Sequence, residues 1–285
     1  MDRMIQGLAY GNELRFFAAY TKETVQEAVN IHKTSPVCSA ALGRLLTASA
    51  MMGRMEKNEN DLVTLRIEGD GPIGGMTVTA DINGHVKGLI GNNRVDLPLK
   101  ENGHLDVGAA VGRGTLSVIR GAANADPYVG QIQLATGEIG DDLTYYFAES
   151  EQIPTSVGLG VLVDRDLSIL HAGGFILQLL PFASEETIAA LESSLKEHSS
   201  VTDFFKEDPD PEAMMRKLLG DITTEDVCEV SYRCSCSRER VEKALISLGR
   251  KELDKLVEEG ENVKLHCDFC NKDYEFTPGE IRALM

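Results

Sequence analysis

Residues 232–249, YRCSCSRERVEKALISLG, and residues 266–276, HCDFCNKDYEF, carry four of the six cysteines of this 285-residue chain. Cys234 and Cys236 form a C-x-C pair, and Cys267 and Cys270 form a C-x-x-C pair. Two close pairs of thiols supply four soft ligands for a tetrahedral ion, as zinc requires in closed sites. We therefore expect one Zn²⁺ per chain, bound by these four cysteines in the reduced state.

The residues around the two pairs predict a small unit over 232–285. Ser237 can cap a helix, a second short helix ends at Gly260, and alternating apolar residues on both sides of the second pair predict a hairpin. Thr277 and Glu280 fit a capping box for a final helix. The unit contains few large apolar side chains, so we expect zinc to supply most of its stability, on the order of 10 kcal/mol.

The C-x-C pair favours a reversible thiol chemistry. A disulfide across one intervening residue is strained, and strained disulfides are easily reduced again. Nearby cations favour the thiolate form, and here they are Arg233, Arg238, Arg240 and Lys243. Because oxidation would consume the zinc ligands, it would also unfold a unit that depends on zinc. Closed four-cysteine sites are usually structural, however, so a purely structural zinc protein is an alternative.

Upstream of this unit, periodicity predicts an α+β domain over residues 1–181, a mixture of helices and antiparallel sheet. Residues 22–56 have helical spacing, and 142–152 are predicted to form a further helix. Apolar residues alternate with polar ones in LVTLRIE, GMTVTAD and HVKGLIG, and strands are also expected at 116–120, 128–134 and in a pair over 154–180.

Residues 182–231 are predicted to form an acidic, metastable helical linker. Acidic residues far outnumber basic ones between 183 and 212, yet Ile188, Leu191 and Leu195 keep helical spacing, as do residues 214–219. Short amphipathic helices are marginal in water without a partner surface. The expected organisation is therefore a core domain at 1–181, a linker at 182–231 and a zinc unit at 232–285.

Charge and hydropathy exclude several classes of protein. The net charge is −17, from 45 acidic and 28 basic residues, which disfavours a nucleic-acid partner because the phosphate backbone is also negative. The longest apolar runs fall short of the roughly 20 residues that span a bilayer, and the N-terminus lacks the pattern of a secretory signal. We expect a cytoplasmic protein with no membrane partner.

Two short segments match enzyme motifs but lack the surrounding elements that those motifs require, and we expect no enzymatic activity. Gly69, Gly71 and Gly74 fit G-x-G-x-x-G, but a strand pattern follows where a dinucleotide site needs a helix, so a hairpin turn is predicted. Residues 193–196 fit S-x-x-K without the other elements of an acyl-enzyme. Four sulfur ligands leave no open position for a catalytic zinc.

The two cysteine segments, together with YFAESEQIPTSVGLGV at 146–161 and AGGFILQLLP at 172–181, resemble the redox-regulated heat-shock holdase chaperones of 33 kDa. This resemblance covers nearly the whole chain. It implies that Cys234, Cys236, Cys267 and Cys270 bind zinc in an inactive reduced form. It further implies that oxidation under stress joins Cys234 to Cys236 and Cys267 to Cys270, releases zinc and unfolds the linker. A homodimer would then bind unfolding client proteins, through client-binding and dimerisation surfaces on the core domain.

The remaining cysteines and one histidine lie outside the motif. Cys38 is predicted to be a buried apolar residue, and Cys228 to be unreactive because Glu225, Asp226 and Glu229 would raise its pKa. His266 is expected to face away from the metal on the hairpin. A zinc ribbon that binds nucleic acid is a further alternative, which the charge disfavours.

Overall fold

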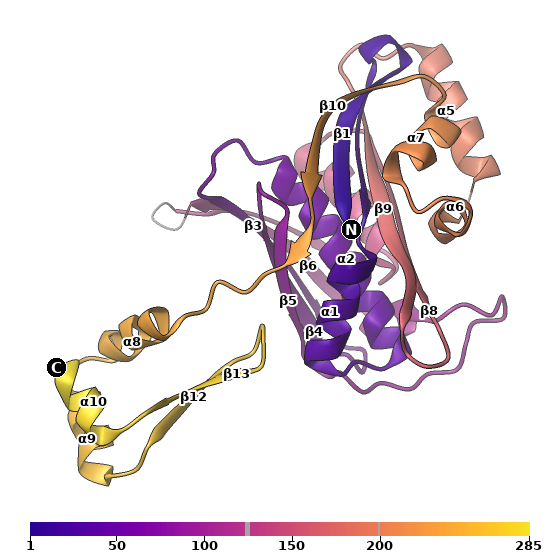
Figure 1. Ribbon diagram of the computed structural model, residues 1–285. Helices are drawn as coiled ribbons and strands as arrows, with labels where there is room; N and C mark the ends of the chain where they lie inside the picture. Colours follow the sequence, from indigo (N-terminus) through magenta and orange to yellow (C-terminus); the bar gives the residue numbers. More distant parts are fainter. Residues whose placement is uncertain (123–125, 199) are drawn as a thin grey trace. The chain divides into compact units, whose positions relative to one another are not determined.

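The structure is a computed structural model that describes residues 1–122, 126–198 and 200–285. The chain forms two compact units, Met1–Tyr232 and Arg233–Met285, coloured from indigo to orange and from orange to yellow in Figure 1. The predicted α+β class is confirmed, with mixed helices and antiparallel sheets. The predicted division of the larger unit into a core domain and a linker at residue 181 stays a prediction.

One sheet of the larger unit has five antiparallel strands. Its order is β10 (Ile222–Glu229), β1 (Arg3–Ala9), β2 (Leu14–Tyr20), β9 (Ile169–Leu179) and β8 (Thr155–Val163). The predicted pair β8 and β9 is confirmed. The sequence analysis did not predict β1, β2 or β10. Strand β2 is buried on both faces and therefore shows no alternation, whereas β10 is polar in sequence because it lies at the edge.

The second sheet has six strands. Its order is β11 (Ser231–Tyr232), β5 (His85–Ile90), β4 (Gly75–Asp81), β3 (Asp61–Gly69), β6 (Gly114–Ala122) and β7 (Tyr128–Gln133). All pairs are antiparallel except β11 with β5. On β3 and β4, inward residues are buried and outward residues are not. This alternation is what made the strands predictable.

The glycine motif forms the turn between β3 and β4. Gly69 ends β3, and Gly74 has a φ of 79°, a left-handed conformation that favours glycine. The N–H of Gly74 donates to the carbonyl of Gly71, at 3.0 Å. The turn joins two paired antiparallel strands, so the predicted hairpin is confirmed.

The helix α2 (Pro36–Arg54) forms the centre of the core, because nearly all of its residues from Val37 to Gly53 are buried. It packs on both sheets and follows α1 (Lys22–His32), as the sequence predicted. The helix expected over 142–152 begins earlier, as α4 (Ile139–Tyr146), and continues as a π-helical turn at Phe147–Glu151. The short elements α3 (Val107–Val111) and a 3₁₀ turn at Tyr10–Asn12 were not predicted.

Three helices of the acidic segment cover the outer face of the five-stranded sheet (Figure 1). They are α5 (Glu185–Glu197), α6 (Val201–Glu207) and α7 (Pro211–Leu219). Their apolar side chains share a buried cluster with residues of β2 and β9, and the rings of Phe205 and Tyr20 lie 5.0 Å apart between centroids. The apolar face of the five-stranded sheet thus supplies the partner surface that short amphipathic helices require.

The smaller unit has two strands and three helices around a minimal core. Its elements are α8 (Arg238–Ser247), α9 (Arg250–Glu259), β12 (Val263–Cys267), β13 (Lys272–Phe276) and α10 (Pro278–Ala283). Only four side chains in this unit are fully buried hydrophobes: Leu245, Leu253, Phe276 and Ile281. The predicted hairpin and the Thr277–Glu280 capping box are confirmed.

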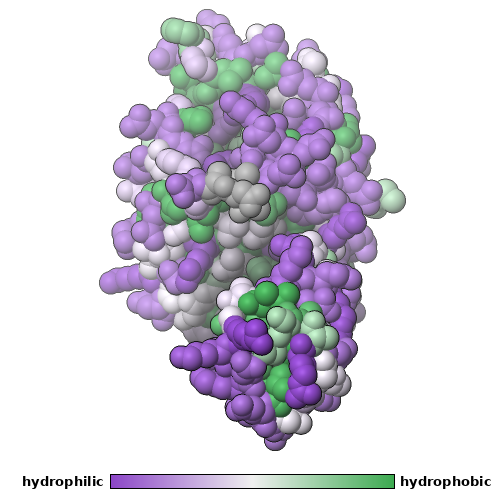
Figure 2. Space-filling view, turned by 90° about the vertical axis from the view of Figure 1, so that its left-hand side faces the viewer, coloured by the Kyte–Doolittle hydropathy of each residue, from purple (hydrophilic) through white to green (hydrophobic). Residues whose placement is uncertain are grey.

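The surface is largely hydrophilic, as expected for a chain in which 26% of the residues are charged. On the face drawn in Figure 2, hydrophilic residues predominate and hydrophobic residues gather in patches. Within the described residues, no helix has both the length and the apolar character needed to cross a membrane.

A carboxylate fixes the start of α5 to the first hairpin. Glu13 accepts hydrogen bonds from the N–H of Ser184 at 3.0 Å, from the hydroxyl of Ser184 at 2.7 Å and from the hydroxyl of Thr187 at 2.5 Å. The Thr187 bond, followed by the two Ser184 bonds, lowers the pKa of Glu13. Since these bonds favour the ionised form in the folded state, their stabilisation is present above the ordinary pKa of 4.5 and is lost as the pH falls through the lowered value.

Replacing Glu13→Gln should therefore loosen the start of α5 at neutral pH. We expect a several-fold loss of amide protection in the first turn of α5 at pH 7, corrected for intrinsic exchange rates, and little difference from the wild type once the pH is below the folded pKa. Glu27→Gln, an exposed carboxylate on α1, is the matched control. Equal protection of α5 in both variants at pH 7 would refute this role.

Candidate metal centre

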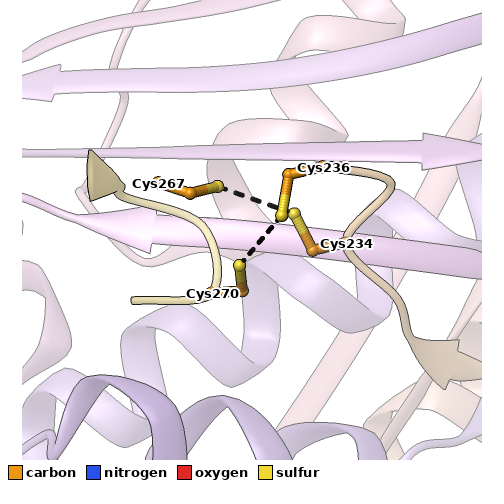
Figure 3. Close-up of side chains that lie close together, drawn as sticks. All are labelled: Cys234, Cys236, Cys267 and Cys270. Atoms are coloured by element: carbon orange, nitrogen blue, oxygen red, sulfur yellow. Dashed lines mark hydrogen bonds between the residues drawn. The ribbon is translucent and has the colours of Figure 1, made fainter. Parts of the chain in front are cut away.

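Two chain segments of the smaller unit bring the four cysteines together. Cys234 and Cys236 lie in the extended segment before α8, and Cys267 ends β12. The chain then turns tightly, because the N–H groups of Cys270 and Asn271 both donate to the carbonyl of Cys267, at 3.2 and 2.8 Å. Asn271 takes a left-handed φ of 53° in this turn. Figure 3 shows the four sulfur atoms directed toward one another.

The sulfur positions suit a tetrahedral ion. All four lie within 4.8 Å of one another. Those of Cys234 and Cys267 are 3.7 Å apart, and those of Cys236 and Cys270 are 3.2 Å apart. A tetrahedral zinc with Zn–S bonds of about 2.3 Å separates its sulfurs by roughly 3.8 Å. The donor set therefore fits zinc after small movements, and among the described residues it is the one cluster of three or more metal-ligating side chains.

A tyrosine that the sequence analysis treated as an apolar strand residue contacts the cluster. The hydroxyl of Tyr274 donates to the sulfur of Cys236 at 3.1 Å. Burial alone would raise the pKa of Cys236, but this hydrogen bond and those with the neighbouring thiols lower it to about 7. Burial raises the pKa values of Cys234 and Cys270. Hydrogen bonds from outside the ligand set commonly orient metal ligands, and Tyr274 occupies such a position.

The arginines expected to favour the thiolates mainly serve the fold. Arg238 donates to the carbonyl of Glu275 at 3.0 Å and to the carboxylate of Glu280 at 2.6 Å, and lies 4.3 Å from the ring centroid of Phe276. Arg240 donates to the hydroxyl of Ser235 at 2.7 Å. Both guanidinium groups are thus held by neighbouring oxygen atoms of the smaller unit, and their expected effect on the thiolates stays a prediction.

The two other cysteines lie in the larger unit. Cys38 is fully buried, as predicted, and its thiol donates to the carbonyl of Asn92 at 3.3 Å. The pKa of Cys228 is raised, as predicted, but for a different reason. Burial is the main cause and Asp81 adds to it, while Arg54 opposes it. The carboxylate of Asp226, expected to contribute, is instead paired with Arg54.

His266 does not join the sulfur cluster. Its ring bonds to the carboxylate of Asp273 at 2.7 Å and to the side-chain oxygen of Asn271 at 3.3 Å, on the exposed side of the hairpin. The alternation of β12 explains this, because Cys267 and His266 are adjacent and therefore point to opposite faces.

The fold and the site define this chain as an α+β protein with a C-terminal four-cysteine unit that can hold a metal ion. Its sequence matches the family described as Hsp33 protein over residues 2–277. The chain belongs to this family, which is a family of chaperones.

Known proteins of similar sequence and structure agree. A 33 kDa chaperonin of Lachnoclostridium phytofermentans is 48% identical over 286 residues, covering 100% of this chain and 98% of that protein. One from Thermoanaerobacter sp. is 46% identical over 287 residues, with 100% and 98% coverage. The crystal structure of the 33 kDa chaperonin of Thermotoga maritima superposes with a TM-score of 0.90 at 35% identity, covering 99% of this chain and 97% of that one.

Removing one sulfur should empty the metal centre without oxidation. We expect Cys267→Ser to reduce bound zinc from about one ion per chain to a small fraction, and to abolish amide protection around Leu253 and Phe276, because structural zinc contributes on the order of 10 kcal/mol. Cys228→Ser, a thiol outside the cluster, should keep its zinc. Atomic emission and hydrogen exchange measure the two effects, and unchanged zinc content in Cys267→Ser would disprove the ligand assignment.

Proposed function

We propose that this chain is a redox-regulated holdase that binds unfolding proteins under oxidative stress. The observation that carries the proposal is the meeting of four thiols within 4.8 Å in a unit whose core has only four fully buried hydrophobic side chains. Zinc, when bound, supplies cross-links that this core lacks. Oxidation of the sulfurs removes the ligands, so the same atoms that fold the reduced unit report the oxidant.

The thiol chemistry balances with a peroxide as oxidant. Each disulfide formed from two cysteine thiolates gives two electrons to one hydrogen peroxide, whose O–O bond breaks, and two protons from solvent complete the two water molecules that form. Family resemblance favours bridges Cys234–Cys236 and Cys267–Cys270. Crosswise approaches are also short in the structure, because the sulfurs of Cys234 and Cys267 lie 3.7 Å apart and those of Cys236 and Cys270 lie 3.2 Å apart. Peptide mapping after oxidation distinguishes the two pairings.

The helices α5–α7 supply the surface that oxidation would expose. Their buried residues include Phe204, Phe205, Met214 and Met215, and they cover Phe16, Phe175 and Leu177 on the sheet. Their outward faces are acidic, which would keep an opened form in solution. We further infer that the oxidised form is a homodimer, that clients are unfolded proteins, and that the chain works in the cytoplasm.

The test compares reduced and oxidised protein. Peroxide with mild heating should release about one zinc per chain to a chromophoric chelator, and only then should the protein suppress light scattering by a thermally unfolding client. The double variant Cys38→Ser/Cys228→Ser should behave in the same way, because both thiols lie outside the cluster. Equal suppression by the reduced zinc form would favour a purely structural zinc protein and end the proposal.

A further inference from the structure

Nearly every sheet edge in the described residues is protected. An unprotected edge offers a row of unpaired backbone groups to any extended chain. Proteins protect edges with charged side chains, with a covering helix or loop, or by keeping the edge strand very short. The free edge of β8 is covered by α4: the N–H of Val157 donates to the hydroxyl of Thr144 at 3.1 Å, and a side chain at Gly140 would lie 3.2 Å from the carbonyl of Val157. The opposite edge strand, β10, carries Glu225, Asp226 and Glu229.

The other edges are protected as well. In the six-stranded sheet, the edge strand β11 has only two residues. The hydroxyl of Tyr232 donates to the carbonyl of Gly88 in β5 at 2.8 Å, and this hydrogen bond blocks part of the edge of β5. The two-stranded sheet of the smaller unit has charged residues on both strands, including Lys264 and Glu275. Arg238 also donates to the carbonyl of Glu275.

Strand β7 is the exception. Its sequence, YVGQIQ, contains no charged residue and no proline, and within the described residues no strand pairs with its outer side. Tyr128 and Val129 are 58% and 53% exposed. Gln131 and Gln133 are exposed as well, while Gly130 and Ile132 are buried. The π-helical turn Phe147–Glu151 packs against the buried face of β7, where a side chain at Gly130 would lie 2.7 Å from the hydroxyl of Ser150. The outer side of β7 has no charged residue to oppose pairing, although about a quarter of the chain's residues are charged.

We propose that the outer edge of β7 binds an extended, uncharged segment of an unfolded client by β-strand addition. This proposal rests on the proposed holdase function and specifies how a client segment would be recognised. Backbone hydrogen bonds supply affinity that does not depend on the client's sequence, as a general holdase requires. The neighbouring side chains Val129, Gln131 and Gln133 then favour apolar and polar uncharged residues on the added strand.

Charge favours a client over a second copy of this chain. Each copy has a net charge of −17, so the homodimer proposed above needs an extended contact to offset the repulsion between two acidic bodies, and a six-residue edge strand alone offers little such contact. A neutral or basic unfolded segment meets no such repulsion. β7 has six residues. A client segment of similar length in extended conformation can therefore pair along the whole strand.

The test uses an uncharged decapeptide rich in Val, Thr and Ser, with blocked termini and a neutral coumarin label, and the oxidised full-length protein. We expect Val129→Lys/Gln133→Lys to weaken peptide binding about tenfold or more, since lysine on an edge strand opposes pairing. Leu62→Lys/Thr77→Lys is the matched control, with the same charge change on the same solvent-facing side of interior strands β3 and β4. It should bind within about twofold of the wild type.

A second arm isolates the backbone. The same peptide, methylated on alternate amide nitrogens, keeps its side chains but loses the donors of one edge, so it should bind the wild type as weakly as the plain peptide binds the β7 variant. Hydrogen exchange should show new protection of β7 amides when the plain peptide is bound.

Each contrary outcome has one meaning. Equal binding of both peptides, or equal binding by both double variants, would overturn the edge proposal while leaving the holdase function intact, provided that the oxidised wild type suppresses aggregation. Failure of that suppression would refute the holdase function instead. Loss of the oxidised dimer in Val129→Lys/Gln133→Lys by sedimentation, with peptide binding unchanged, would show that β7 serves a second copy and would also overturn the proposal.

Discussion

The proposed function depends on one physical interaction, the attraction of four sulfur atoms within 4.8 Å for one ion. Its buried core consists of Leu245, Leu253, Phe276 and Ile281, and units of this size rarely gain more than about 3–5 kcal/mol from a core alone. Structural zinc adds on the order of 10 kcal/mol. If zinc binds as we propose, the metal contribution is the larger of the two and oxidation of the ligands removes it. In the larger unit, Cys38 and Cys228 pack against the hydrophobic core.

The larger unit contains one almost fully buried helix and three helices that are buried on one face only. Helix α2 is buried along its length between two sheets, whereas α5–α7 contribute one apolar face each and leave an acidic face in water. Such helices hold their structure only while the sheet surface is available to them. Glu13 adds a small number of polar bonds at the start of α5. The proposed opening on oxidation requires a cover of this kind, which protects the apolar face of the sheet but can leave it.

Sequence reasoning succeeded where one residue type or one period dominates. The spacing of Cys234, Cys236, Cys267 and Cys270 predicted the sulfur cluster, whose atoms lie within 4.8 Å of one another, and alternation predicted the strands β3, β4 and β5. It failed at β2, where burial on both faces erases alternation, and at β10, whose polar sequence becomes a strand only through pairing with β1. It also missed Tyr274, because its contact with Cys236 depends on how the hairpin faces a segment 38 residues away. Cys228 was assigned the right pKa direction from the wrong neighbours, since burial is a tertiary property.

We infer that the metal, and not the small core, keeps the C-terminal unit folded. The most direct test removes zinc from the reduced wild-type chain with a strong chelator, without any oxidant, and follows amide exchange across the sequence. We expect protection to be lost throughout α8 to α10, while α2 and the central strands β2 and β3 keep theirs, and to return when zinc is added back. Full protection of Leu245, Phe276 and Ile281 in the metal-free reduced chain would contradict this inference.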